Sequence, residues 1–281
     1  DEVAQVYVKL PERDEVMPIK ELKGFERVTL KSGESKKVTL KLRKDLLRYW
    51  DEAKGKFVYP SGDYTIMVGA SSADIRLQKV VPVLQKVKVV CVGASITAGA
   101  TTANPATDSY PAQLGRLLGN EYEVTNYGVS SCTMLRHGDF PYWKTKEYQK
   151  ALESNPDVVF IDLGGNDSKA VNRPYMHEFE KDCRDMIDAF AQLPSKPRIV
   201  VLTPIVSFVK DSNGIYDEVI VKDVTPATIS AVQKKNVEVI NMHPILDKHP
   251  ELMKDGIHPD AEGSGMMAKA MYDYLMSHPE K

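Results

Sequence analysis

From Val87 onward, short apolar segments rich in β-branched residues alternate with segments of helical periodicity. The first apolar segment, residues 87–92, is interrupted only by Lys88, a pattern typical of a strand buried on both faces of a sheet. The repeated order of strand, turn and helix predicts an α/β fold: a doubly wound parallel five-stranded sheet with helices on both faces. The expected strands are 87–92, 122–127, 157–163, 198–203 and 237–241, and the expected helices include 110–118, 179–190 and 266–276.

Residues 1–78 follow a different pattern, in which apolar and polar residues alternate with a period of two and no helical period is present. Several short strands at regular spacing predict a β-sandwich. The turn at residues 60–63 is expected to close a hairpin between the last two strands. Residues 79–86, which contain Pro82, are expected to be a short linker to a second domain at 87–281. The expected strands of the sandwich are 3–8, 28–30, 38–42, 57–59 and 64–68.

The composition limits the partners and cofactors of this chain. It carries 37 Lys and Arg against 39 Asp and Glu, a net charge of −2, so neither nucleic acid nor an anionic membrane is an expected partner. No apolar stretch approaches the roughly 20 residues of a membrane helix, and no signal-peptide pattern is present, although a mature chain would also lack one. Cys91, Cys132 and Cys183 give no disulfide framework and no zinc spacing. Cys91 and Cys183 lie in apolar patterns and are expected to be buried thiols.

The residues that follow each expected strand are the candidates for chemistry, because ligands of a doubly wound sheet bind beyond the carboxyl ends of its strands. The first strand ends in Gly93-Ala94-Ser95. This turn of small residues would expose the Ser95 hydroxyl beside the start of a helix, where backbone amides stabilise negative charge. Ser95 is therefore a candidate nucleophile, and a helix-capping serine is the alternative.

Three further loops carry candidate residues. Gly128 follows the second expected strand and allows a ligand to approach the backbone closely, and Asn166 follows two glycines after the third strand and offers a carboxamide donor. His258 follows Asp255 by three residues, a spacing at which the carboxylate can orient an imidazole base. Each feature alone is also explained as a turn or a helix cap. A metal site made of Asp255, His258 and Asp260 is less favoured, because it leaves the serine and the asparagine without a role.

Ser95, Gly128, Asn166 and His258 occur in this order, each in a loop expected at the carboxyl edge of the sheet. With these four blocks the chain resembles the SGNH, or GDSL-like, hydrolase family over about residues 87–277. The resemblance implies a flavodoxin-like α/β fold. It also implies serine esterase chemistry through an acyl-enzyme, with no metal and no cofactor.

The same resemblance implies a role for each matching residue. Ser95 would be the nucleophile, His258 the general base, and Asp255 the carboxylate that orients the base. The amides of Ser95 and Gly128 and the side chain of Asn166 would form the oxyanion hole. These roles together describe a carboxylic ester hydrolase.

Two nearby features bear on subfamily and substrate. Ala94 stands where the name-giving pattern of the family has an aspartate, a position outside the catalytic roles. The polar and aromatic segment 136–143 follows the second of the four blocks and supplies candidate substrate-binding residues. Trp143 or Tyr142 would stack on a sugar and Arg136 would hydrogen-bond to it. Packing of Trp143 in the core is the alternative.

Four N-terminal segments carry a second resemblance, namely 18–25, 30–34, 60–64 and 68–72. They are similar to the C-terminal fibronectin type III-like domain of family 3 glycoside hydrolases, the β-glucosidase group. The resemblance implies a structural module that lacks about two initial strands, and therefore a partial β-sandwich with a sheet edge to be covered or left open. Tyr49, Trp50 and Tyr59 are expected to pack in a core or between domains, with a sugar platform as the alternative.

The combination of the two modules favours a carbohydrate substrate. We expect removal of acetyl groups from plant cell-wall sugars such as acetylated xylan, with a glycoside hydrolase domain upstream in the native polypeptide as a partner. A secreted or periplasmic bacterial location is expected. One alternative is a feruloyl or general short-chain esterase or lipase, and an alternative of another class is a non-catalytic carbohydrate-binding module. Residues 93–99 lack the G-x-G-x-x-G spacing of a nucleotide site.

Overall fold

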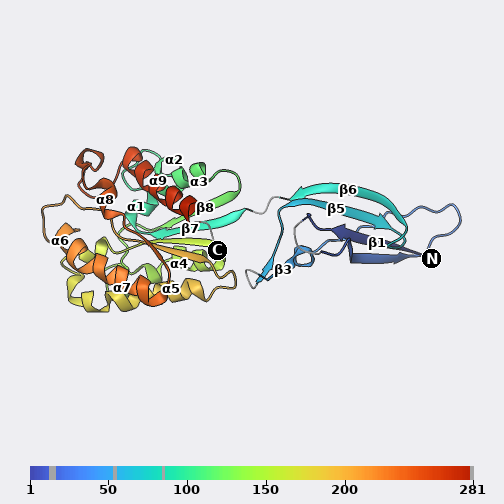
Figure 1. Cartoon of the computed structure of the whole chain (residues 1–281), viewed down its shortest axis with the longest axis horizontal. Coiled ribbons are helices and arrows are strands. Elements are labelled where there is room, and N and C mark those ends of the chain that lie inside the picture. The colour runs from blue at the N-terminus through green and yellow to red at the C-terminus, as the bar shows by residue number, and fades with distance from the viewer. Residues whose placement is uncertain (13–16, 53–55, 84–85, 279–281) are drawn as a thin grey trace. The chain divides into compact units, whose positions relative to one another are not determined.

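The computed structural model describes residues 1–12, 17–52, 56–83 and 86–278. The chain divides into two compact units, Asp1–Gln85 and Lys86–Lys281. Figure 1 shows the first unit as strands with little helix and the second as a sheet with helices on both faces. Among the described residues, no helix is both long enough and apolar enough to cross a membrane.

The second unit is built on a five-stranded parallel sheet with the order β11-β10-β9-β7-β8. Numbered within the unit, the order is 2-1-3-4-5, the flavodoxin-like arrangement. This confirms the predicted fold, and every strand lies within two residues of its expected bounds. The strands are β7 (Val87–Gly93), β8 (Tyr122–Gly128), β9 (Val158–Asp162), β10 (Arg198–Leu202) and β11 (Glu238–Ile240).

Nine α-helical segments are present in the described part of this unit, together with five 3-10 or π segments. The α segments are α1 (Ser95–Ala98), α2 (Pro105–Asp108), α3 (Tyr110–Leu118), α4 (Lys146–Glu153), α5 (Phe179–Ala191), α6 (Asp217–Val219), α7 (Thr225–Lys235), α8 (His243–Leu246) and α9 (Ala261–Ser277). The 3-10 or π segments are η2 (Tyr142–Lys144), η3 (Asn166–Ser168), η4 (Arg173–Glu178), η5 (Ile220–Val224) and η6 (Pro250–Leu252).

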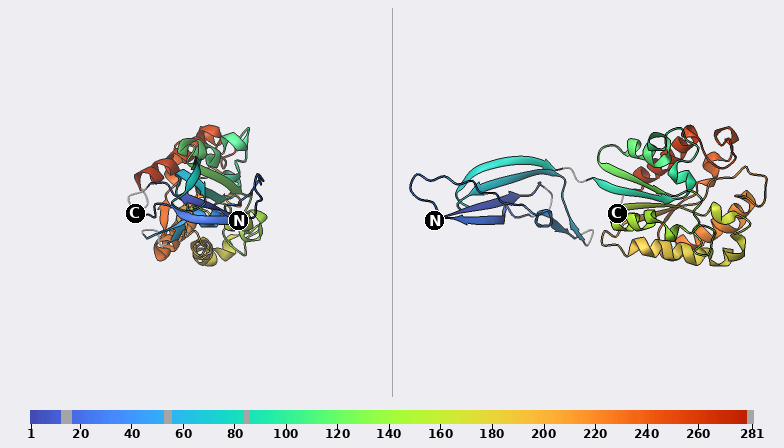
Figure 2. Two further views of the ribbon diagram at one scale, coloured as in Figure 1. Left: turned by 90° about the vertical axis from the view of Figure 1, so that its right-hand side faces the viewer. Right: turned by 180° about the vertical axis from the view of Figure 1, so that it is seen from behind.

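Successive residues of the central strand β7 point into two separate cores. Val90 and Val92 pack in one core with residues of α4, α5 and α7, and Val89 and Cys91 pack in the other with residues of α3, α8 and α9. The two groups of helices lie on opposite faces of the sheet (Figure 2). This two-sided burial explains why the strand is apolar almost throughout. Cys91 and Cys183 are buried free thiols, as predicted, and so is the third cysteine.

The first unit contains a four-stranded antiparallel sheet with the order β2-β1-β5-β6 and a separate two-stranded sheet, β3-β4. The strands are β1 (Glu2–Lys9), β2 (Glu21–Val28), β3 (Tyr49–Asp51), β4 (Lys56–Val58), β5 (Gly62–Gly69) and β6 (Ile75–Val83), and a 3-10 turn, η1 (Lys44–Leu47), precedes β3. A small core of Val8, Leu10, Tyr49 and Tyr64 joins the two sheets. Trp50 is on the opposite side of its strand, half exposed and edge-on against Phe57.

Several details of this unit differ from the expectation. Residues 38–42 belong to no strand, and of the expected strand at 28–30 only Val28 is in a strand, as the last residue of β2. The turn at 60–63 closes no hairpin, because β4 pairs with β3 while β5 pairs with β1 and β6. Residues 79–83, expected in a linker, form the second half of β6. Pro82 fits there because β6 is an edge strand.

Candidate active site

Ser95 is the first residue of α1 and lies directly beyond the carboxyl end of β7. Strand and helix pack closely here, since a Cβ on Gly93 would collide with the Thr97 Oγ1 and lie 2.7 Å from the Asp162 carbonyl oxygen. Only glycine fits at the end of β7, because any side chain there would prevent α1 from packing this closely after the turn. Ser95 is 8% exposed and lines a pocket. The structure therefore places the serine at the predicted edge of the sheet.

His258 and Asp255 complete a hydrogen-bonded chain that starts at Ser95. The Ser95 Oγ lies 2.8 Å from the Nε2 of His258, and the Nδ1 of His258 lies 2.6 Å from the Oδ2 of Asp255. The other carboxylate oxygen of Asp255 accepts the amides of Ile257 at 2.9 Å and His258 at 2.8 Å. The geometry is that of a nucleophile, a base, and a carboxylate that orients the base.

The electrostatics of Asp255 suit an ionised orienting group. Partial burial raises the pKa of this carboxyl, but the hydrogen bonds from the His258 amide and ring and from the Ile257 amide outweigh burial, so the pKa lies below its ordinary value. A carboxylate that stays charged favours the imidazole tautomer with its proton on Nδ1. That tautomer leaves Nε2 free to accept the hydroxyl proton of Ser95.

Asp260, the third residue of the alternative metal site, is a helix cap. Its carboxylate accepts the amides of Glu262 at 3.0 Å and Gly263 at 3.1 Å and so begins α9 directly after the loop that holds His258. Among the described residues, no group of three or more His, Cys, Asp or Glu is arranged to hold a metal ion.

Asn166 lies on η3, after β9, and is brought to the same pocket as Ser95. The residue is 4% exposed, and its Nδ2 donates one hydrogen bond to the Cys132 carbonyl at 3.1 Å. An amide nitrogen carries two protons, so one remains for a ligand. The position is the one predicted for an oxyanion donor.

Gly128, the other predicted oxyanion donor, is directed elsewhere. Its amide donates to the Oδ1 of Asn126 at 2.8 Å, and a Cβ at this position would collide with the Ala98 amide nitrogen. Gly128 is therefore needed for the packing of β8 against α1. Its amide is already engaged, which contradicts its assignment to the oxyanion hole.

Ser131 is the candidate donor that the sequence did not reveal. It is exposed, it has a φ of 68°, and its amide makes no hydrogen bond to any described residue. It directly precedes Cys132, whose carbonyl holds the side chain of Asn166. A left-handed backbone is the available signal, but it is normally marked by glycine rather than serine.

The three predicted substrate-binding residues do not reach this pocket. Tyr142 is completely buried, and its hydroxyl donates to the Tyr127 carbonyl at 2.6 Å. The Nε1 of Trp143 donates to the Met134 carbonyl at 2.7 Å, and the guanidinium of Arg136 lies 3.7 Å from the centre of the Trp143 ring. Trp143 thus packs against Met134 and Arg136, as in the alternative expected for it, and none of the three residues lines the pocket beside Ser95.

The pocket beside Ser95 is mostly apolar and has a volume of about 430 Å³ including its open mouth. Such a lining suits the hydrocarbon part of an acyl group. It consists of Ala94, Ser95, Ile96, Asp162, Gly165, Asn166, Pro204, Ile205, Val206, Ser207, Ile215, Ile220 and Ile257.

A buried polar cluster around Thr97, two residues after the nucleophile, is a further feature that the sequence did not reveal. Thr97 donates from its Oγ1 to the Asp162 Oδ2 at 3.0 Å, and the Tyr110 hydroxyl lies 2.8 Å from the same Oγ1. The Thr97 carbonyl accepts the Nδ2 of Asn126 at 2.6 Å. These bonds anchor α1, and with it Ser95, to β8, β9 and α3. Burial raises the pKa of Asp162 to about 6, against the lowering effect of the two hydroxyls.

The Asp162→Asn variant should change how stability depends on pH. A carboxyl whose pKa is about 6 when folded and 3.8 ordinarily stabilises the fold fully below about pH 4, and this contribution is lost as the pH rises through 6. The free energy of unfolding of the wild type, relative to the variant, should therefore fall by on the order of 3 kcal/mol between pH 4 and pH 7. Urea unfolding of both proteins across this range measures the difference, and a constant difference would refute the assignment.

Comparisons with known proteins agree with the two units. The fibronectin type III-like domain family matches residues 2–72, and the GDSL-like lipase/acylhydrolase family matches residues 91–265. An acetylxylan esterase of Xylanibacter ruminicola is 36% identical over 76% of this chain and 50% of that protein. A probable β-glucosidase L of Aspergillus fumigatus is 44% identical over 75 residues, 27% of this chain and 10% of that protein. The chain thus spans about half the length of the first relative and a tenth of the second.

A solved carbohydrate acetylesterase from Sinorhizobium meliloti has the same fold as the second unit. The TM-score is 0.54 at 18% identity, over 68% of this chain and 99% of that chain. The sequence match to residues 91–265 covers more than half of the chain, and the chain therefore belongs to the GDSL-like lipase/acylhydrolase family.

Proposed function

We propose that this chain is a serine esterase that removes acetyl groups from plant cell-wall carbohydrate, as an acetylxylan esterase does. The observation that carries the proposal is the continuous hydrogen-bonded chain from the Ser95 Oγ through His258 to Asp255, at 2.8 and 2.6 Å. It opens on a pocket that Asn166 also lines.

In the proposed reaction the Ser95 Oγ attacks the ester carbonyl while the Nε2 of His258 takes its proton. The oxyanion accepts hydrogen bonds from the Ser95 amide, the Ser131 amide and the Asn166 Nδ2, each worth roughly 3–4 kcal/mol in the transition state. As the acyl C–O bond breaks, His258 gives this proton to the departing sugar oxygen, which leaves as a hydroxyl. Water, deprotonated by the same imidazole, attacks the acyl-enzyme and releases acetate and the free serine. Asp255 stabilises the imidazolium in both halves.

The substrate class rests on two similarities and on the pocket. The relative that matches 76% of this chain is named an acetylxylan esterase, and a 75-residue part of this chain is similar to part of a β-glucosidase. A glycoside hydrolase domain in the same native polypeptide and a secreted or periplasmic location would both suit a polymeric substrate. The apolar pocket beside Ser95 accommodates a short acyl group.

Acetate release from acetylated xylo-oligosaccharides, compared with aryl acetate, butyrate and ferulate esters, tests the proposal. We expect kcat/KM to be highest for the acetylated xylo-oligosaccharides, with the Ser95→Ala variant as the background. A preference for butyryl or feruloyl esters would contradict the proposed substrate but would leave the proposed mechanism in place. Binding of the oligosaccharide with no hydrolysis of any ester would identify a non-catalytic carbohydrate-binding module instead.

A further inference from the structure

Two buried carboxylates hold three successive backbone amides of the loop that follows β8. Asp167, which is completely buried, accepts the Met134 amide on Oδ2 at 3.0 Å and the Leu135 amide on Oδ1 at 2.8 Å. Asp182, on α5 and 3% exposed, accepts the Arg136 amide on Oδ2 at 2.8 Å. The loop is thus fixed along its backbone and not only through its side chains.

These contacts lie next to the candidate oxyanion donors. Asp167 follows Asn166 in η3, and Asn166 binds the Cys132 carbonyl of the same loop at 3.1 Å. Ser131, with its left-handed backbone and unengaged amide, is the residue just before Cys132. The turn η3 therefore carries Asn166, one of the two donors. Through Asn166 and Asp167 it also holds the loop residues that follow Ser131, the other donor.

We propose that Asp167 and Asp182 are positioning residues, which hold this loop so that the Ser131 amide and the Asn166 side chain stay aligned on the oxyanion. The proposal rests on the esterase function proposed above. Neither carboxylate touches the substrate, and both act through the backbone of the loop. Alignment of this kind matters because an error of about 1 Å in a catalytic group costs roughly a hundredfold in rate.

Each carboxylate oxygen of Asp167 accepts one amide of the loop, so both oxygens must act as acceptors. In the described part of the chain, no Lys or Arg forms an ion pair with this carboxylate. Burial raises its pKa to about 7, against the lowering effect of the Leu135 and Met134 amides, and the nearby Asp139 raises it further. A neutral asparagine has one acceptor oxygen and would turn its amino group toward one of the two amides. A carboxylate is the side chain that satisfies both.

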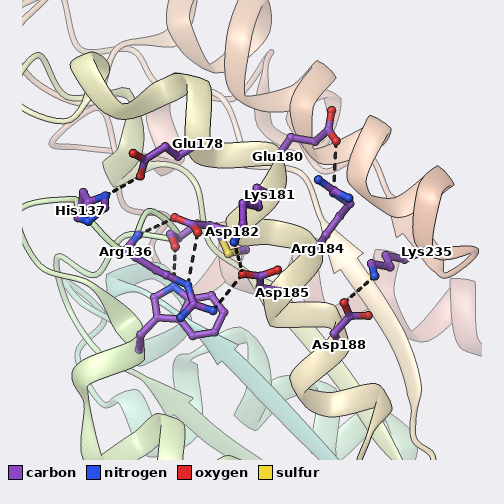
Figure 3. Close-up of polar contacts among 12 residues, drawn as sticks. Arg136, His137, Glu178, Glu180, Lys181, Asp182, Arg184, Asp185, Asp188 and Lys235 are labelled. Carbon is purple, nitrogen blue, oxygen red and sulfur yellow. Dashed lines mark hydrogen bonds and ion pairs between the residues drawn. The ribbon is translucent and has the colours of Figure 1, made fainter.

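Asp182 differs because a cation accompanies it. Its Oδ1 lies 3.4 Å from the Nε of Arg136, while the Nη2 of the same arginine lies 3.3 Å from the Oδ2 of Asp185 (Figure 3). Asp185 thus binds two side chains, those of Arg136 and Lys181, and accepts no amide of the loop. It is one helical turn from Asp182 on α5 and provides a matched control.

Steady-state kinetics on an aryl acetate test the proposal. We expect Asp167→Asn to lower kcat about 10- to 100-fold with KM within about twofold, and Asp182→Asn to lower it by less. Asp185→Asn should leave both constants within about twofold. In the Asn166→Ala background the effect of Asp167→Asn should shrink, because both changes damage the same oxyanion site. An unchanged kcat, or a rise confined to KM, would overturn the proposal.

Hydrogen exchange separates this proposal from the proposed function. In Asp167→Asn the amides of Met134 and Leu135 should exchange at least about tenfold faster, with the core strands unaffected. If Asp167→Asn fails to fold, the Arg136 amide in Asp182→Asn gives the same readout. Faster exchange in a protein that hydrolyses no ester would reject the esterase and keep the loop contacts. Unchanged exchange and kcat in an active enzyme would reject the positioning role alone.

Discussion

The Ser95→Ala variant is expected to lose about 10⁵- to 10⁶-fold in kcat on any ester that the wild type hydrolyses. The Oγ of Ser95 is the atom that would form the acyl-enzyme, and it is hydrogen-bonded to the Nε2 of His258. Alanine removes that one hydrogen bond and leaves the backbone of α1 unchanged. The melting temperature should therefore stay within a few degrees of the wild type.

Steady-state kinetics with circular dichroism on the same samples measure this result. Ser72→Ala, which changes an exposed serine of the N-terminal unit, is the matched control and should keep full activity. Retained turnover in a folded Ser95→Ala protein would show that another group performs the attack. Loss of activity together with loss of the fold would make the variant uninformative about chemistry, and Ser95→Cys would then be measured for partial activity.

The His258→Ala variant should show a loss of similar size, about 10⁵- to 10⁶-fold in kcat. Its imidazole joins the Ser95 Oγ to the Asp255 Oδ2, so its removal leaves the nucleophile without a base. Because the serine and the histidine act as one unit, the double variant should be no worse than either single one. Kinetics of the two single variants and the double variant test this non-additivity.

His249→Ala is the control for the histidine variant, since His249 is partly exposed and pairs with Glu251. It should leave kcat unchanged. A double variant that loses the product of the two single effects would mean that Ser95 and His258 contribute independently. Such additivity would contradict a shared proton transfer.

The sheet and the order of the catalytic blocks could be read from the sequence because both depend on burial. A parallel strand covered on both faces must be apolar along its length, so β7 and β9 are conspicuous in the sequence. The polar residues that interrupt the pattern at the strand ends are Ser95, Asn166 and, after the last strand, Asp255 and His258. The topology then brings together residues that are far apart in the sequence.

The features that could not be predicted from the sequence depend on backbone conformation and on neighbouring segments, which residue type alone does not determine. Ser131 has a left-handed backbone, but serine does not mark one, so the neighbouring Gly128 was favoured instead. The polar and aromatic segment 136–143 has the composition of a sugar site. In the structure Tyr142 and Trp143 donate to backbone carbonyls, and Arg136 lies over the Trp143 ring. In the N-terminal unit, alternation at 38–42 predicts a pleated segment but cannot supply the neighbouring strand that a ladder requires.

Reaction of the intact chain with a fluorophosphonate, followed by mass spectrometry of its peptides, tests the central claim most directly. A nucleophilic serine activated by a base forms a covalent phosphonyl adduct, which mimics the tetrahedral intermediate. The account predicts one adduct per chain, located on Ser95, that forms far more slowly in His258→Ala. An adduct on another residue, or a chain that hydrolyses esters without any labelling of Ser95, would contradict it.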